Sequence, residues 1–522
     1  MNQNLNLYLI LGIVIVYFVG LLVIAYFTSK NADNNSFFIG NKKSKWWLVA
    51  FGMIGTSLSG VTFISVPGTV GKMTDGTFPF QAFEYFQIVI GYFLGYFVVA
   101  FVLLPIYYKM NLTSIYTYLD NRFNKEAHKT GSLYFIISRS IGATARLYLV
   151  INVLQLFLFD RIGIPFYITT LIILLMILLY TYEGGVKTIV ITDTLQTTFM
   201  LISLIACIFF ILNQLNFSIV EGIQALSNQN YDHIFNYNFS APSFFLKSIV
   251  GGMFITIAMT GLDQEMMQKN ISVKNLYDSK KNMLTFASIM VFVNFLFLFL
   301  GGLLYIFAQS KGGKYITETV TENGKESIKK SFQIFDTTKN EIVNLMGDDL
   351  FPTMALHGFF PILIAIIFII GLVSALFPSA DGALTSLTSS FCVDILGIQK
   401  DELKSEATKK KTRIRVHLAF TMLFFILIMI FKIINDKSII YFIMDLAGYT
   451  YGPLLGLFAF GILTKRHIEI PNSIFIVCLL SPLFTYLLKN YLFPVINYNV
   501  GLELIVLNGL LTFLGLFIVS KK

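Results

Sequence analysis

The chain contains little charge for its length. Only 13% of its 522 residues are Asp, Glu, Lys or Arg, whereas 56% are hydrophobic, and the mean hydropathy is +0.72. Soluble domains carry about 25% charged residues, so this composition excludes an ordinary soluble enzyme or binding domain. The sequence predicts a polytopic membrane protein.

Cysteine and histidine are also scarce, with three Cys and five His in the whole chain. Cys207, Cys392 and Cys478 each lie within or at the end of an apolar stretch, which favours packing over disulfide formation or metal binding. We find no metal-spaced cluster and no nucleophile motif, so no enzyme is predicted. The net charge of +9 is spread over several loops, which argues against nucleic-acid binding.

What the chain does contain is a series of about thirteen long apolar stretches. A helix needs about 20 apolar residues to cross a bilayer. The first stretch lacks the basic start and small-residue cleavage site of a secretory signal, so we expect a retained helix. The predicted spans lie near residues 6–28, 46–71, 80–108, 131–159, 163–181, 185–214, 243–268, 281–309, 358–391, 412–433, 438–464, 470–491 and 500–520.

Loop charges predict the orientation of these spans. Residues 269–281 and 400–415 are rich in Lys and Arg, whereas residues 215–242 contain neither. Because positive loops stay in the cytoplasm, we expect the N-terminus outside and the C-terminus inside. The long outer loop, residues 309–357, is then expected to be a solvated connector, with a cap over an entrance as the alternative.

The second span concentrates glycine and hydroxyl residues at mid-depth, between residues 52 and 68. A helix of this composition can unwind, and transporters use unwound carbonyls to coordinate sodium. Close packing of small residues against a neighbouring helix is the alternative. The seventh span, with Gly251, Gly252 and Gly261, offers a weaker counterpart.

Two interrupted helices five spans apart predict an inverted repeat. In this interpretation residues 46–214 form the first repeat and residues 243–464 the second. Residues 6–28 and 470–520 are peripheral helices, and residues 1–522 form a single transporter domain.

The ninth span is rich in oxygen atoms that a hard cation such as sodium prefers. Pro378 frees the backbone carbonyl of Ser374, four residues earlier. Ser379 and Ser386 add side-chain hydroxyls, although each hydroxyl can equally bond back to its own helix.

Six ionisable residues lie within predicted spans, where a charge costs roughly 2.5 to 3.5 kcal/mol. Arg139 and Arg146 share one helix face two turns apart, so we expect one to pair with a carboxylate and the other to face a substrate. Asp263 and Glu265, near the inner interface, are expected to be solvated. The six residues are Glu84, Arg139, Arg146, Asp193, Asp381 and Asp445.

Three stretches of this sequence resemble the sodium:solute symporter family. They are residues 192–196 with the preceding Gly184 and Gly185, residues 379–394, and residues 57–68. The resemblance covers nearly the whole chain, and family members carry sugars, proline, sialic acid, monocarboxylates, vitamins or iodide. It implies an all-α polytopic membrane protein with about 13 transmembrane helices and a LeuT-like 5+5 inverted-repeat core. It also implies Na+ coupling, a bacterial inner membrane and a functional monomer in membrane lipid.

The family's sodium site carries over to this sequence by position. Its implied ligands are the carbonyls of Gly55, Leu58 and Ala375 and the hydroxyl of Ser379. Pro378 stands where the family usually has a second hydroxyl residue, so one ligand is lost.

Some family members have a second sodium site. Here it would use Asp193 together with the positions that Asp381 and Gly382 now hold. We therefore treat Asp193 and Asp381 as a candidate second sodium site or as part of the sodium exit path. A structural salt bridge is the alternative for Asp193.

The implied substrate residues give two clues about solute charge. Glu84 and Gln87 suit sugar hydroxyls, whereas Arg146 suits a carboxylate because its planar fork can bind two oxygens. The family's sugar-binding Asn and Lys are replaced near Ile257 and Met290. The full predicted set is Ser57, Ser59, Thr62, Glu84, Gln87, Arg146, Phe254 and Thr260.

The sequence thus predicts sodium-coupled import of a sugar or sugar acid, such as sialic acid, by alternating access. One alternative is a symporter for monocarboxylates or other organic anions. Another, from a different class, is a sodium-independent or proton-coupled facilitator that uses Asp193 and Asp381 as proton carriers.

Overall fold

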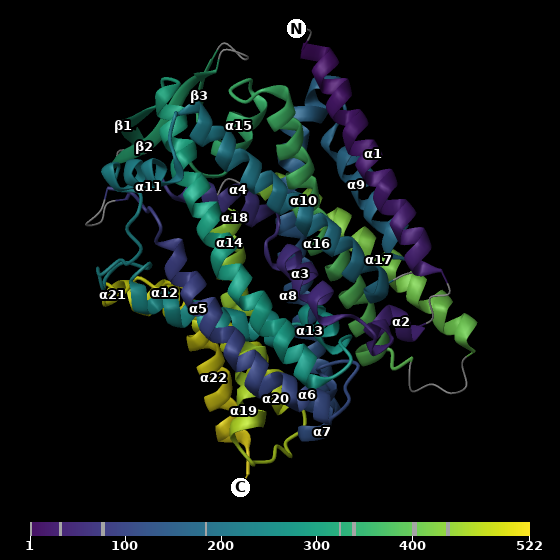
Figure 1. The fold of residues 1–522 in the computed structure, drawn as a ribbon. Coiled ribbons are helices and arrows are strands. Elements are labelled where there is room, and N and C mark those ends of the chain that lie inside the picture. Colours follow the sequence, from purple (N-terminus) through teal and green to yellow (C-terminus); the bar gives the residue numbers. More distant parts are fainter. Residues whose placement is uncertain are drawn as a thin grey trace.

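A computed structural model describes residues 3–30, 34–74, 79–182, 185–322, 325–336, 341–398, 405–434 and 439–521. Gly184 of the family-like motif and part of the basic segment 400–415 lie outside these residues. Figure 1 shows helix α1 and the N-terminus at the top of the view, and α22 with the C-terminus at the bottom. Most of the described chain is helical.

The helices and strands have the following bounds. The first half contains α1 (Gln3–Ser29), α2 (Asn34–Ile39), α3 (Trp46–Ser57), α4 (Gly60–Thr69), α5 (Tyr85–Val98), α6 (Leu104–Lys109), α7 (Thr117–Arg122), α8 (Lys125–Leu154), α9 (Phe166–Thr181), α10 (Gly185–Gln214) and α11 (Ile219–Asn228). The second half contains α12 (Phe245–Thr256), α13 (Gln264–Ile271), α14 (Leu276–Ser310), β1 (Lys314–Glu322), β2 (Lys325–Asp336), β3 (Glu341–Asn344), α15 (Leu350–Leu356), α16 (Ile362–Ser390), α17 (Glu406–Ile434), α18 (Ile439–Thr450), α19 (Gly452–Leu463), α20 (Ser473–Leu487), α21 (Phe493–Val495) and α22 (Leu504–Val519).

The helices confirm a multi-pass membrane protein. Among the described residues, eight helical segments are long and apolar enough to cross a bilayer, and ten if each of two bent pairs counts as one span. Each predicted span overlaps a helix, but α9, α19 and α22 are apolar helices of only 10–17 residues and are not among the candidate spans. The count of thirteen therefore stays a prediction.

Both predicted helix breaks are present. Helices α3 and α4 meet at 58°, and the segment Phe245–Gly261 meets α13 at 62°. At the first break Ser59 has an extended backbone, and Gly60 lies so close to Val150 of α8 that a side chain there would collide. The small residues thus serve both purposes that the sequence allowed, unwinding and close packing.

The expectation of an all-α chain is wrong in the long loop at residues 309–357, where β1, β2 and β3 form an antiparallel sheet. Segments rich in Thr, Ile and Val favour strands, and Tyr315 pairs with Phe332 across β1 and β2, with ring centroids 4.6 Å apart. The Tyr315 hydroxyl also donates to the carbonyl of Gly71 at 3.0 Å. Since Phe332 and Leu345 are buried, the loop is a packed cap over the end of α4 rather than a solvated connector.

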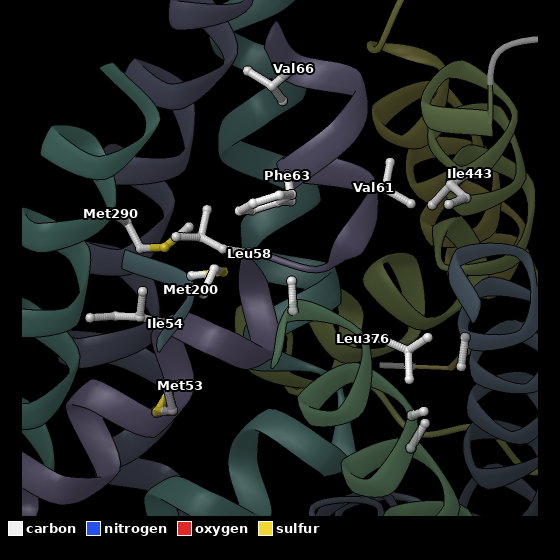
Figure 2. Close-up of a cluster of buried hydrophobic side chains, with 14 of the residues drawn as sticks. Met53, Ile54, Leu58, Val61, Phe63, Val66, Met200, Met290, Leu376 and Ile443 are labelled. Atoms are coloured by element: carbon white, nitrogen blue, oxygen red, sulfur yellow. The ribbon is translucent and has the colours of Figure 1, made fainter. Parts of the chain in front are cut away.

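Apolar side chains surround the first break. Figure 2 shows Leu58 close to Met200 of α10 and Met290 of α14, with Val61 beside Ile443. All five are buried. This packing holds the unwound backbone in one place while its polar groups face a cavity.

Candidate functional site

A cavity of about 120 Å³ lies beside the first helix break. It brings together five of the eight predicted substrate residues, Ser57, Ser59, Thr62, Arg146 and Thr260. The full lining is Thr56, Ser57, Leu58, Ser59, Val61, Thr62, Tyr85, Tyr92, Tyr96, Arg139, Arg146, Ile255, Thr256, Met259, Thr260, Met266, Met290, Asn294 and Ile443. These residues come from both halves of the chain.

Three predicted substrate residues lie elsewhere. Glu84 Oε1 accepts a hydrogen bond from Asn236 Nδ2 at 3.0 Å, and Gln87 Oε1 accepts from the Asn236 backbone N–H at 3.2 Å. Both side chains therefore hold the segment that follows α11, and Glu84 borders a second cavity of about 220 Å³. Phe254 packs partly buried against the apolar core. Tyr85 lines both cavities.

Three tyrosines in the lining were not predicted. Tyr85, Tyr92 and Tyr96 lie on α5 at spacings of seven and four residues, which places them on one helix face. That spacing is visible in the sequence and is the signal that would have found them. Asn294 of α14 also lines the cavity, but its Nδ2 donates to the carbonyl of Met290 at 2.8 Å.

The two arginines of α8 have different partners. Arg139 forms a buried ion pair with Glu265 Oε2. Arg146, in contrast, makes no hydrogen bond or ion pair with any residue that the structure describes, although it forms part of the cavity wall. The expected carboxylate partner is thus present for Arg139, whereas contact of Arg146 with a substrate stays a prediction.

The expectation that Asp263 and Glu265 are solvated is wrong, because both are buried. The bend before α13 turns this helix into the protein, so its polar residues meet other helices instead of water. Asp263 Oδ1 accepts from the backbone N–H groups of Glu265 and Met266, and Asp263 Oδ2 accepts from the Tyr451 hydroxyl at 2.7 Å. Lys269, assigned to an inside loop, is buried as well.

Lys269 joins α13 to α3 and α10. Its Nζ donates to Asp193 Oδ2 at 2.6 Å and to Thr56 Oγ1, and it lies 3.9 Å from Glu265 Oε1. Asp381 makes no direct bond to Lys269, since its Oδ2 accepts from the Tyr180 hydroxyl at 2.7 Å and its Oδ1 from the Gly382 N–H. Asp193 therefore has a lysine partner, which the sequence did not reveal.

The predicted sodium ligands lie on α16 and at the first break. Gly55 approaches Pro378 closely, so that a Cβ on Gly55 would lie 3.4 Å from Pro378 Cγ. The Ser379 hydroxyl donates to the carbonyl of Leu376 at 3.0 Å, which leaves the lone pairs of its oxygen free to face a cation. Among the described residues, no group of three or more His, Cys, Asp or Glu side chains is placed to hold a metal ion.

Comparison with known proteins gives a consistent set of relatives. A profile of the Sodium:solute symporter family matches residues 37–469. A sodium/sialic acid symporter of Proteus mirabilis is 25% identical over 463 residues, covering 85% of this chain and 82% of the relative. Another, from Aliivibrio fischeri, is 24% identical over 446 residues and covers 84% and 80%.

Two solved structures share the fold. A Na+-coupled sialic acid symporter in a substrate-bound outward-open state superposes with a TM-score of 0.77, at 19% identity, over 98% of this chain and 99% of that chain. A nucleobase-cation-symport-1 family transporter in a closed conformation gives 0.54, at 12% identity, over 94% and 95%. These similarities confirm the predicted LeuT-like arrangement of helices.

Proposed function

This chain belongs to the sodium:solute symporter family, and we propose that its solute is a small hydroxylated carboxylate, a sugar acid such as sialic acid. The chain is a sodium-coupled transporter that binds a solute and Na+, and it is not an enzyme. The observation that carries the proposal is Arg146, a guanidinium without a carboxylate partner among the described residues, in the wall of a cavity rich in hydroxyls.

The chemistry of the cavity supports an anionic solute. A guanidinium binds a carboxylate through two parallel hydrogen bonds, which adds both energy and geometric selectivity. Helix α4 begins at the cavity without a side-chain cap, so its N-terminal N–H groups favour negative charge as well. Glu265 is bound to Arg139, so Arg146 is left as a guanidinium in the cavity wall with no ion-pair partner among the described residues.

Hydroxyl groups supply the second half of the recognition. Ser57, Ser59 and Thr62 lie at the break, and Thr260 with three tyrosines of α5 faces them. These groups both donate and accept hydrogen bonds, as polyol recognition requires. The two bacterial relatives are named as sodium/sialic acid symporters, and these names support the same class of solute.

We propose that sodium binds between the first break and α16, at the carbonyls of Gly55, Leu58 and Ala375 and the hydroxyl of Ser379. Because Leu58 belongs to both this set and the cavity lining, an ion here would hold the break in the form that binds solute. Sodium binding is then coupled to solute binding because sodium stabilises the conformation that binds solute more than it stabilises the other conformations. One charge that crosses about 100 mV supplies roughly 2.3 kcal/mol, and a tenfold sodium gradient adds about 1.4 kcal/mol.

The rest of the mechanism follows from the repeat organisation that we propose. Residues 46–214 and 243–464 rock against each other around the cavity, while residues 6–28 and 470–520 stay peripheral. In this proposal the N-terminus lies outside the cell and the C-terminus inside. The protein acts as a monomer in the bacterial inner membrane.

The test is uptake into proteoliposomes of sialic acid, galactose, glucose and pyruvate, with an inward sodium gradient or with potassium in place of sodium. We expect sodium-dependent uptake of sialic acid. Sodium-dependent pyruvate uptake alone would favour the monocarboxylate alternative. Hexose uptake would favour recognition by Glu84 and Gln87. Sialic acid uptake that ignores sodium would overturn sodium coupling in this chain.

A further inference from the structure

We infer that Lys269 is a tethered cation that occupies the place of a second sodium ion at Asp193, so that this transporter binds one sodium ion per cycle. The inference rests on the proposed function, because it concerns the stoichiometry of the sodium coupling. It resolves the two roles that the sequence left open for Asp193.

The ammonium group of Lys269 is surrounded by oxygen atoms. Nζ donates to Asp193 Oδ2 at 2.6 Å and to Thr56 Oγ1, and it lies 3.9 Å from Glu265 Oε1. The four residues belong to α3, α10 and α13, and each is between 0 and 3% exposed. The three donors of the ammonium thus have a carboxylate, a hydroxyl and a second carboxylate around them.

A sodium ion at Asp193 would need these same oxygen atoms. Hard cations bind carboxylate, hydroxyl and carbonyl oxygens, and the ammonium carries the same single charge in the same place. The two cations cannot both occupy it. Asp193 Oδ1 and Glu265 Oε1 have no hydrogen-bond partner in the described structure, so oxygens suited to sodium remain once the lysine is removed.

Two basic side chains of this cluster each have a carboxylate partner without a metal ion. Lys269 pairs with Asp193, and Arg139 of α8 pairs with Glu265. A sodium ion beside these two buried pairs would be a third cation in a low-dielectric interior, where Lys269 and Arg139 repel it. Asp381 also interacts with Lys269, and its own oxygens accept hydrogen bonds from the Tyr180 hydroxyl and the Gly382 N–H.

Lys269 is also fixed in position. Glu265, one turn before it on α13, is held by Arg139, and Asp263 caps the N-terminus of the same helix. Because the cation is part of the chain, it does not dissociate when the cavity opens to either side. The charge at Asp193 is therefore compensated throughout the cycle, and only the site between Gly55 and Ser379 is left for sodium.

Equilibrium binding of radioactive sodium to the purified full-length protein in nanodiscs, with potassium as the background salt, tests this inference without a solute. We expect one sodium ion per wild-type protein, one per Lys269→Arg protein and two per Lys269→Gln protein. The double variant Lys269→Gln with Asp193→Asn should return to one, which would place the additional ion at Asp193.

Two bound sodium ions in the wild-type protein would overturn the inference, and so would a folded Lys269→Gln protein that still binds one. If Lys269→Gln does not fold, Lys269→Met and Lys269→Ala take its place in the same measurement, and a folded variant that binds only one sodium ion overturns the inference. A wild-type protein that binds no sodium would instead contradict the proposed function.

A transport measurement gives a second readout. At zero membrane potential and with a tenfold sodium gradient, one sodium ion per solute sustains about tenfold accumulation of sialic acid, whereas two sustain about a hundredfold. We expect about tenfold accumulation by the wild-type protein. Accumulation near a hundredfold would contradict the inference that Lys269 occupies the place of a second sodium ion.

Discussion

The two bent helix pairs share a geometry but differ in chemistry. The first break bends by 58° and the second by 62°. At the first, Ser59 makes no capping bond with its side chain, and the break is lined by hydroxyls that face the cavity. At the second, Asp263 caps α13, and Glu265 and Lys269 pair with other helices. The first break is thus left open for ligands, and the second is closed by charges of the chain.

The largest effect is expected from breaking an ion pair at the second break. Arg139→Gln leaves Glu265 buried without its partner, which typically costs about 3 to 5 kcal/mol. We expect a large loss of thermal stability in detergent or of folded protein. Lys489→Gln is the control, because its pair with Asp445 is exposed and should contribute about 0 to 1 kcal/mol. Equal losses in the two variants would show that the second break is not held by this pair.

Removal of Arg146 should act on solute binding at the first break. A hydrogen bond to a charged group contributes about 1.5 to 3 kcal/mol, so Arg146→Gln should weaken sialic acid binding by about 10- to 150-fold. Arg146→Lys keeps the positive charge but lacks the planar guanidinium that can bind both carboxylate oxygens, so we expect a smaller loss of sialic acid affinity. Thermal stability should change little, because Arg146 has no partner in the described structure. Unchanged sialic acid affinity in both variants would remove Arg146 from the solute site.

Ser379→Ala should raise the sodium concentration for half-maximal uptake, because it removes one proposed ligand. We expect a shift of about tenfold, equivalent to about 1.4 kcal/mol. Ser310→Ala is the matched control, since the Ser310 hydroxyl donates to the carbonyl of Phe307 in its own helix at 2.7 Å and lies outside the proposed sodium site. If both variants shift alike, sodium is not bound at Ser379.

The smallest expected effect is the difference in unfolding free energy between variants of the N-cap residues at the two breaks, Asp263 and Ser59. Asp263→Ala removes a helix cap and the acceptor of the buried Tyr451 hydroxyl, so it should lower the free energy of unfolding by at least about 1 kcal/mol. Ser59→Ala removes no capping bond, so we expect a change in solute affinity with little change in stability. Thermal unfolding of both variants measures the difference, and the reverse order of stabilities would contradict the comparison.

The sequence predicted the first break more fully than the second. Glycines and hydroxyls at mid-depth are a local pattern, so the bend could be inferred without a structure, as could four of the six residues that it contributes to the cavity lining, Ser57, Leu58, Ser59 and Thr62. The second break depends on pairs that are distant in sequence, with Lys269 76 residues from Asp193 and Glu265 126 residues from Arg139. A hydropathy profile predicts that such charged residues at the end of a span are solvated, because it contains no information about ion-pair partners elsewhere in the chain.

Two other differences have similar causes. The spacing of Glu84 and Gln87 placed them on one helix face, but no local signal showed that Asn236 would meet that face. The sheet of the outer loop was missed because its strands are polar and alternate weakly, and their packing depends on contacts such as Tyr315 with Gly71.

The most direct test of the account is the binding of sialic acid to the purified protein in sodium and in potassium. If sodium holds the first break in its binding form and Arg146 receives the carboxylate, the wild-type protein and Glu84→Gln should bind in sodium much more tightly than in potassium, and Arg146→Gln should bind poorly in both. Equal affinity of the wild-type protein in the two salts, or undiminished binding by Arg146→Gln, would contradict it.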